Sequence, residues 1–139
     1  MDYEKTLEEL EETIAELIEE NKMVPIIVEG EKDESALRKL GMTGEIIRVN
    51  AGVSLANFCD RLARKYQSII LLTDWDMKGG HLFSAIKKQL KGRVVCTTKY
   101  RDVIAKRSMI RTLEGLPSWL NTLKEKVNER KTYTFSRLM

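Results

Sequence analysis

The chain has few of the side chains that usually build disulfide scaffolds or zinc centres. Its 139 residues include two cysteines and one histidine. Cys59 and Cys96 lie far apart, each follows an apolar residue, and neither belongs to a CxxC pair. Buried free thiols are therefore favoured over a disulfide or a zinc site.

Long apolar runs and targeting signals are also missing. No apolar run approaches the roughly 20 residues that a membrane-spanning helix needs. The first residues are acidic and polar, unlike the basic and then apolar start of a secretory signal. The length suffices for one domain with a single core. We therefore expect a cytoplasmic protein with no membrane partner.

Charge is plentiful but unevenly distributed along the chain. The formal net charge is +3, yet residues 1–22 carry nine acids and only two lysines. Residues 77–139 hold fifteen lysines and arginines against four acids. This asymmetry favours a polyanionic partner, namely RNA or DNA. The alternative is an ion-pair-rich surface on which an acidic helix lies against a basic one.

The apolar spacing predicts an amphipathic helix over residues 3–21. Leu7, Leu10, Ile14, Leu17 and Ile18 recur at the intervals of one helix face. We expect this acidic helix, within residues 1–22, to pack on its own domain or on a second copy in a homodimer. Docking to a larger complex is the alternative.

Residues 23–139 are expected to form a single domain with a basic helical extension at the C-terminus. Short apolar runs alternate with helical segments, which predicts a parallel sheet covered on both faces, an open doubly wound α/β domain. The expected strands are 24–28, 45–49, 68–73 and 93–97. The expected helices are 33–40, one capped by Ser54, one opened by Gly79 and Gly80, 100–109, and one from Pro117 to about Arg130. The tail, 132–139, is β-prone and short, and it is left unassigned.

Carboxylates follow two of the expected strands. Glu29 comes directly after the first strand, and Asp74 and Asp76 come directly after the third. The carboxyl ends of strands form the ligand-binding edge of an open α/β sheet, so these acids meet if the two strands are neighbours. Carboxylates that share a small volume need raised pKa values or a cation. Oxygen ligands of this kind suit Mg²⁺, with Mn²⁺ as a replacement.

Glycines and cations beside these acids predict a phosphate-binding site. Glycines at helix starts leave backbone N–H groups accessible to phosphate oxygens. Lysines next to the acids could neutralise a phosphodiester, and a basic cluster beyond the fourth strand could follow a nucleic-acid backbone. The alternatives are Asp76 as a plain helix cap and the basic cluster as a solvated helix face. The predicted phosphate and nucleic-acid contacts are Gly30, Lys32, Lys78, Gly79, Gly80, Lys99, Arg101, Lys106 and Arg107.

The segments VEGEKDESAL and LLTDWDMKGG resemble the two signature motifs of the Toprim domain. That domain occurs in bacterial-type primases, type IA and type II topoisomerases, OLD-family nucleases, recombination-repair proteins and a small rRNA-maturing nuclease. The resemblance covers about residues 24–98 and implies a Toprim-type fold. It implies that Glu29 is a metal ligand or general acid/base, that Asp74 and Asp76 bind the metal, and that Asp33 contributes to a second metal.

We therefore expect a Mg²⁺-dependent phosphodiester enzyme, most plausibly a small Toprim nuclease acting on structured RNA or DNA. The alternative is a non-catalytic or primase-like module that holds nucleic acid within a larger complex. A haloacid-dehalogenase phosphatase is disfavoured because its DxD motif follows the first strand. Two residues stay open: Trp75 could stack on a base or pack in its loop, and His81 could act as a general base or have no role.

Overall fold

Four short apolar strands form one parallel sheet in the order β2-β1-β3-β4. The computed structural model describes residues 1–49 and 52–139. The strands are β1 (Ile26–Val28), β2 (Ile46–Arg48), β3 (Ser68–Leu71) and β4 (Val95–Thr97). Ile26 of β1 pairs with Ile46 on one side and with Ile70 on the other, which fixes β1 and β3 as the central neighbours.

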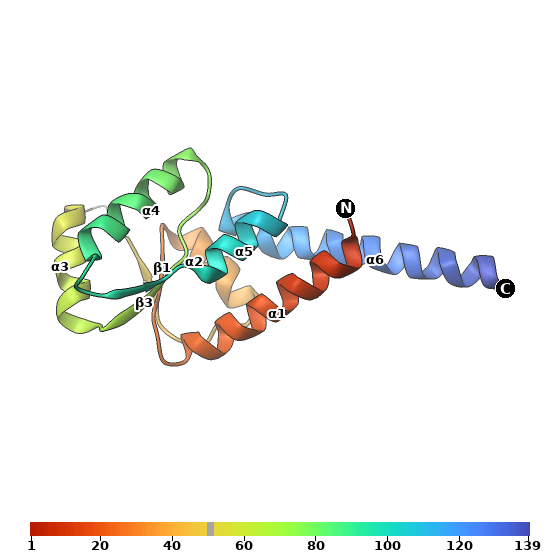
Figure 1. Ribbon diagram of the computed structural model, residues 1–139, viewed down its shortest axis with the longest axis horizontal. Coiled ribbons are helices and arrows are strands. Elements are labelled where there is room, and N and C mark those ends of the chain that lie inside the picture. Colours follow the sequence, from red (N-terminus) through yellow and green to blue (C-terminus); the bar gives the residue numbers. More distant parts are fainter. Residues whose placement is uncertain (50–51) are drawn as a thin grey trace.

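Helices cover both faces of this sheet (Figure 1). One face carries α3 (Leu55–Lys65) and α4 (Met77–Leu90). The other carries the remaining elements, which are α1 (Tyr3–Asn21), α2 (Glu31–Lys39), α5 (Lys99–Arg107), the 3₁₀ turn η1 (Leu113–Gly115) and α6 (Leu116–Leu138). The predicted doubly wound α/β fold is therefore confirmed.

Alternate residues of the central strands supply the two cores. Ile26 and Ile70 face the α1 side of the sheet, whereas Ile27 and Ile69 face α3 and α4. All four side chains are fully buried. This two-sided burial explains why the strands read as continuous apolar runs rather than as alternating ones.

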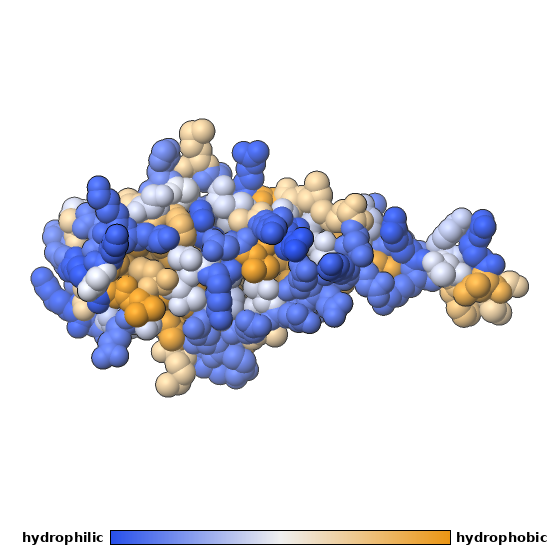
Figure 2. Space-filling model, in the orientation of Figure 1, coloured by the Kyte–Doolittle hydropathy of each residue, from blue (hydrophilic) through white to orange (hydrophobic). Residues whose placement is uncertain are grey.

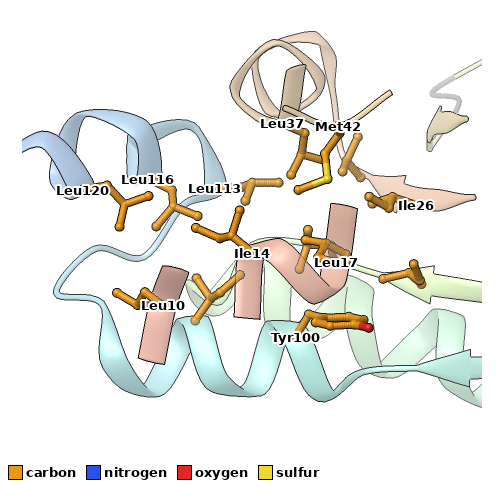
Figure 3. Close-up of a cluster of buried hydrophobic side chains, with 14 of the residues drawn as sticks. Leu10, Ile14, Leu17, Ile26, Leu37, Met42, Tyr100, Leu113, Leu116 and Leu120 are labelled. Carbon is orange, nitrogen blue, oxygen red and sulfur yellow. The ribbon is translucent and has the colours of Figure 1, made fainter. Parts of the chain in front are cut away.

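The α1 helix belongs to the larger of these cores. Leu10 and Leu17 lie in one buried cluster with Leu116, Leu120 and η1 (Figure 3). The apolar face of α1 is therefore occupied by its own domain, and only the acidic face remains for a partner.

The acidic face of α1 meets cations of the basic helices. Glu9 pairs with Arg107 of α5 at 2.6 Å, and Glu4 lies 3.8 Å from Lys131 of α6. Part of the charge asymmetry is thus neutralised within the molecule, as the alternative to a polyanionic partner required.

The last helix is longer than expected. It does not end near Arg130 but continues through residues 132–138, the segment that the sequence left unassigned. This end of α6 projects past the rest of the molecule and carries the apolar residues seen at its tip (Figures 1 and 2). No described strand pairs with it, so helix is the conformation in which its backbone bonds are satisfied internally.

Other expectations hold within one or two residues. Ser54 caps α3 by accepting a hydrogen bond from the Asn57 N–H at 3.1 Å. Both cysteines are free: Cys59 is buried and Cys96 is half-buried. Among residues 1–49 and 52–139, no helix is both long and apolar enough to cross a membrane.

A buried amide at the end of α1 joins three segments that the sequence did not link. Asn21 is 1% exposed and donates through Nδ2 to the carbonyl oxygens of Val24 and Glu45, at 3.1 and 2.9 Å. Its Oδ1 accepts from the Gly44 N–H at 2.9 Å. A Cβ on Gly44 would lie 1.8 Å from the Asn21 carbonyl oxygen, so this approach requires glycine.

Replacing this amide should destabilise the protein markedly. Asn21→Ala leaves the Val24 carbonyl and the Gly44 N–H without these bonds, whereas the Glu45 carbonyl keeps its bond from the Ile26 N–H. Each unpaired group costs about 1–3 kcal/mol. We expect the free energy of unfolding in urea to fall by roughly 2–4 kcal/mol. Asn121→Ala, at an exposed position of α6, is the matched control and should change it by less than about 0.5 kcal/mol. Equal effects of the two substitutions would contradict this role.

Candidate metal site

Four carboxylates gather where β1 and β3 end. The chain leaves β1 towards β2 on one side and reaches β3 on the other, so the gap between β1 and β3 is the switch point of the sheet. Glu29 directly follows β1, and Asp74 and Asp76 follow β3 after two buried residues. Asp33, on the first turn of α2, completes the group. These acids are expected to meet only if β1 and β3 are neighbours, and the structure contains this pairing.

Three of these carboxylates, Glu29, Asp33 and Asp74, have pKa values raised first by burial and then by neighbouring negative charges. Burial raises the pKa of Asp74 to about 6, and the charges of Asp33, Glu29 and Asp76 add to it against the opposing Leu113 N–H. Burial also raises the pKa of Glu29, as do Asp33 and Asp76, although the Asp74 N–H and Lys78 act the other way. The pKa of Asp33 is raised by burial as well. The edge therefore has more negative charge than its surroundings compensate.

Three of the four carboxylates each accept a hydrogen bond from a backbone N–H through one oxygen. Asp33 Oδ2 accepts from the Gly30 N–H at 3.1 Å. Asp74 Oδ1 accepts from the Leu113 N–H, and Asp76 Oδ1 accepts from the Gly79 N–H, both at 2.7 Å. Asp76 is thus the N-cap of α4 as well as a member of the acidic group.

The donor chemistry fits a hard divalent cation. Glu29 Oε1 is buried without a hydrogen-bond partner, and a buried acceptor left unpaired is costly unless a cation or donor reaches it. Within the described residues, no three acidic, histidine or cysteine side chains are yet closed around a common point. Binding would therefore require side-chain rotations, and the residues that could hold Mg²⁺ are Glu29, Asp74 and Asp76, with Asp33 beside them.

A further carboxylate, which the sequence reading missed, lies at the same edge. Glu114 of η1 raises the pKa of Asp33 and sits 3.9 Å from Lys32. It follows neither a strand nor a motif, so nothing in its local sequence marks it. Only the packing of η1 against α2 brings it to the site.

The N–H groups of the three glycines are hydrogen-bonded within the protein. The Gly30 and Gly79 N–H groups donate to Asp33 and Asp76, and the Gly80 N–H donates to the Asp76 carbonyl oxygen at 2.8 Å. A phosphate would have to displace these bonds, and the phosphate contacts of the three glycines stay a prediction. Gly79 is required for another reason, because a Cβ there would lie 2.2 Å from the Asp74 carbonyl oxygen.

Arg101 lies in the wall of the site rather than on its surface. It is 9% exposed and stacks over the Phe83 ring at 3.9 Å. Its Nε donates to the Thr73 carbonyl oxygen at 2.8 Å and its Nη2 to the Asp74 carbonyl oxygen at 2.9 Å. This side chain holds the end of β3, so the structure revises its assignment as a backbone contact of nucleic acid.

The other predicted cations divide into two groups. Lys32, Lys78 and Lys99 are exposed at the helix starts next to the acidic edge. Lys106 and Arg107 lie at the opposite end of α5, about 10 Å further along its axis. Arg107 is also paired with Glu9. The basic cluster is therefore not one continuous surface beside the acids.

Trp75 packs in its loop, the second of the two roles considered for it. It contacts the larger core, and its indole Nε1 donates to the Ile110 carbonyl oxygen at 2.5 Å. His81 is exposed near the start of α4, and its role stays open.

Comparisons with known proteins agree with this geometry. A profile of the Toprim domain matches residues 24–107. A UPF0292 protein of Thermoplasma volcanium is 43% identical over 99 residues, which cover 70% of this chain and 83% of that protein. A UPF0292 protein of Methanocaldococcus jannaschii is 38% identical over 125 residues, covering 87% of this chain and 97% of that one.

A solved structure also matches. A protein from Aquifex aeolicus superposes with a TM-score of 0.64 at 28% sequence identity, over 74% of this chain and 94% of that one. The chain belongs to the Toprim domain family. Membership implies a metal-dependent function connected with nucleic acids, and Toprim domains typically bind Mg²⁺.

The raised pKa of Asp74 predicts how the metal-free protein responds to pH. Because its pKa of about 6 in the folded state exceeds the ordinary 3.8, the folded state retains the proton longer. Stability should therefore be greatest below about pH 4 for this group and decline as pH rises through 6, by roughly 2–3 kcal/mol. Asp74→Asn, measured by urea unfolding in EDTA, should remove most of that decline. Asp102→Asn, at an exposed position, is the control, and an unchanged decline in Asp74→Asn would contradict the assignment.

The two neighbouring glycines of α4 should respond oppositely to alanine. Gly79→Ala forces a Cβ against the Asp74 carbonyl and should cost about 2 kcal/mol or more, as overpacking does. A Cβ on Gly80 meets nothing within 4 Å, so Gly80→Ala should be neutral or stabilise the helix by up to about 1 kcal/mol. Thermal unfolding of both variants tests this, and a destabilised Gly80→Ala would argue against it.

Proposed function

We propose that the protein is a Mg²⁺-dependent phosphodiester enzyme, a nuclease that acts on structured RNA or DNA. The observation that supports it most is the unpaired Glu29 Oε1 among carboxylates at the switch point of the sheet. Such an edge gains stability when a divalent cation neutralises it, and Mn²⁺ offers the same oxygen-ligand chemistry.

Each acidic side chain has a distinct part in this proposal. The bound metal would polarise the scissile phosphate and activate a water molecule. Asp74 and Asp76 would hold the metal, and both are fixed by backbone N–H groups. Glu29 would ligate through its unpaired oxygen or carry a proton, for which its raised pKa suits it. Asp33, whose pKa is raised in part by Glu114, would contribute to a second metal.

The exposed lysines beside this edge would position the substrate. Lys78 acts electrostatically on Glu29, and Lys32 follows Gly30 on the next turn. Together with Lys99 they could contact phosphates on either side of the scissile bond. Lys106 and Arg107, at the far end of α5, are outside this immediate group.

One observation favours a second function, a non-catalytic or primase-like nucleic-acid-binding module. Asp33, Asp74 and Asp76 each hold a backbone N–H, so the acidic group also has a structural use. A protein that needed these carboxylates only to shape the loops would still present the lysines to a nucleic acid. Turnover distinguishes the two functions.

Purified full-length protein should cleave at least one of structured RNA, single-stranded RNA, single-stranded DNA or duplex DNA in Mg²⁺ or Mn²⁺. Glu29→Gln removes the charge and proton-transfer capacity and should lower the rate by about 100-fold or more. Asp76→Asn keeps a good helix cap while removing a ligand charge, so it should lose activity without unfolding. The exposed Glu31→Gln is the control and should retain the wild-type rate.

Two outcomes would contradict the nuclease. If the wild-type protein binds these nucleic acids but cleaves none of them in either metal, the binding module is correct. If cleavage survives Asp76→Asn and Glu29→Gln unchanged, the site has been assigned to the wrong residues.

A further inference from the structure

The segment between α5 and α6, residues 108–115, lies against the loop that carries the two aspartates. It follows the part of the chain that matches the Toprim domain, residues 24–107. Three hydrogen bonds join it to that loop. The Trp75 N–H donates to the Arg111 carbonyl oxygen at 3.1 Å, Trp75 Nε1 donates to the Ile110 carbonyl oxygen at 2.5 Å, and the Leu113 N–H donates to Asp74 Oδ1 at 2.7 Å.

The two bonds from Trp75 fix the part of the segment that comes just before Leu113. The two from Trp75 fix the backbone at residues 110 and 111. Leu113 follows two residues later, and its N–H donates to the Asp74 carboxylate. The position of that donor therefore depends on where Trp75 holds the preceding residues.

The segment has little freedom to move in other ways. Leu113 is fully buried in the larger core between α1 and α6 (Figure 3). Ile110 packs against the same core and lies 3.6 Å from the place of a Cβ on Gly115. Both ends of the segment are thus anchored, and the Leu113 N–H points at Asp74 as part of a rigid unit.

Asp74 is held from its other side as well. Arg101 of α5 donates to the carbonyl oxygens of Thr73 and Asp74, so the main chain of Asp74 is fixed by one element and its carboxylate by another. With its backbone fixed, the direction of the second carboxylate oxygen is set by the bond from Leu113.

We propose that Trp75 is a positioning residue for the metal site: by holding residues 110 and 111 it places the Leu113 N–H that orients the Asp74 carboxylate towards the metal. The inference rests on the proposed function in one respect, that Asp74 is a metal ligand. Groups that orient a ligand in this way typically contribute 10–100-fold to metal affinity.

The test compares the two tryptophans of the chain. Trp75→Phe keeps an aromatic ring in the loop but loses the indole donor to Ile110. Trp119→Phe is the matched control, because Trp119 packs half-buried against the same core. In calorimetric titration of the full chain, Trp75→Phe should bind Mn²⁺ about 10-fold more weakly. Trp119→Phe should stay within about twofold of wild type, and thermal unfolding should show both variants folded.

Amide hydrogen exchange gives a second readout, and its main measurement uses the wild-type protein. The Leu113 amide of the wild-type protein should be among the slowly exchanging ones without metal and should stay protected when Mn²⁺ binds. In Trp75→Phe it should exchange faster. An exposed-type exchange rate at Leu113, or protection lost on Mn²⁺ binding, would overturn the proposal even if Trp75→Phe failed to fold.

Loss of the metal site and loss of the positioning role give different results in this titration. Wild-type protein that binds no Mn²⁺ sinks the metal site itself, and this inference with it. Wild-type protein that binds Mn²⁺ while Trp75→Phe and Trp119→Phe match it keeps the site and rejects Trp75 as a positioning residue.

Discussion

The parallel pairing of β1 with β3 is the contact on which the candidate site depends. Taken alone, neither strand requires a cation, because water can solvate the acids that follow it. Their adjacency puts Glu29, Asp74 and Asp76 at one edge, and partial burial there makes each negative charge felt by the others. The candidate cation site therefore results from the strand order, which brings these acids together.

The surrounding structure tolerates this repulsion because it fixes the carboxylates with backbone donors and a buried cation. The N–H groups of Gly30, Gly79 and Leu113 each take one carboxylate oxygen. The Arg101 guanidinium, stacked on Phe83, ties down the end of β3. Three carboxylates are therefore held by bonds to the main chain, and a metal would need their remaining oxygens brought together by side-chain rotation.

Some charged residues elsewhere in the molecule form internal ion pairs, and others lie exposed near the acidic edge. The apolar face of α1 lies in the larger core, and two of its acids pair with Arg107 and Lys131, so docking through the rest of its acidic face stays a prediction. Some cations of the basic C-terminal half thus form ion pairs within the molecule. What remains near the acidic edge is a short group of lysines, which is a smaller nucleic-acid surface than the composition alone indicates.

The sequence by itself determined the fold class and the acidic residues, because strand–helix alternation and the two motifs are local patterns that neighbouring residues encode. It did not show that Trp75 is tied to Ile110, that Glu114 joins the site, or that Arg101 is buried. It also assigned the glycine N–H groups to a ligand, whereas their own helix-start carboxylates take two of them. Those outcomes were decided by the tertiary structure, because they depend on which distant backbone groups α5, η1 and α6 bring against the ends of β1 and β3, and hydrogen-bond partners so far apart leave no periodicity in the chain.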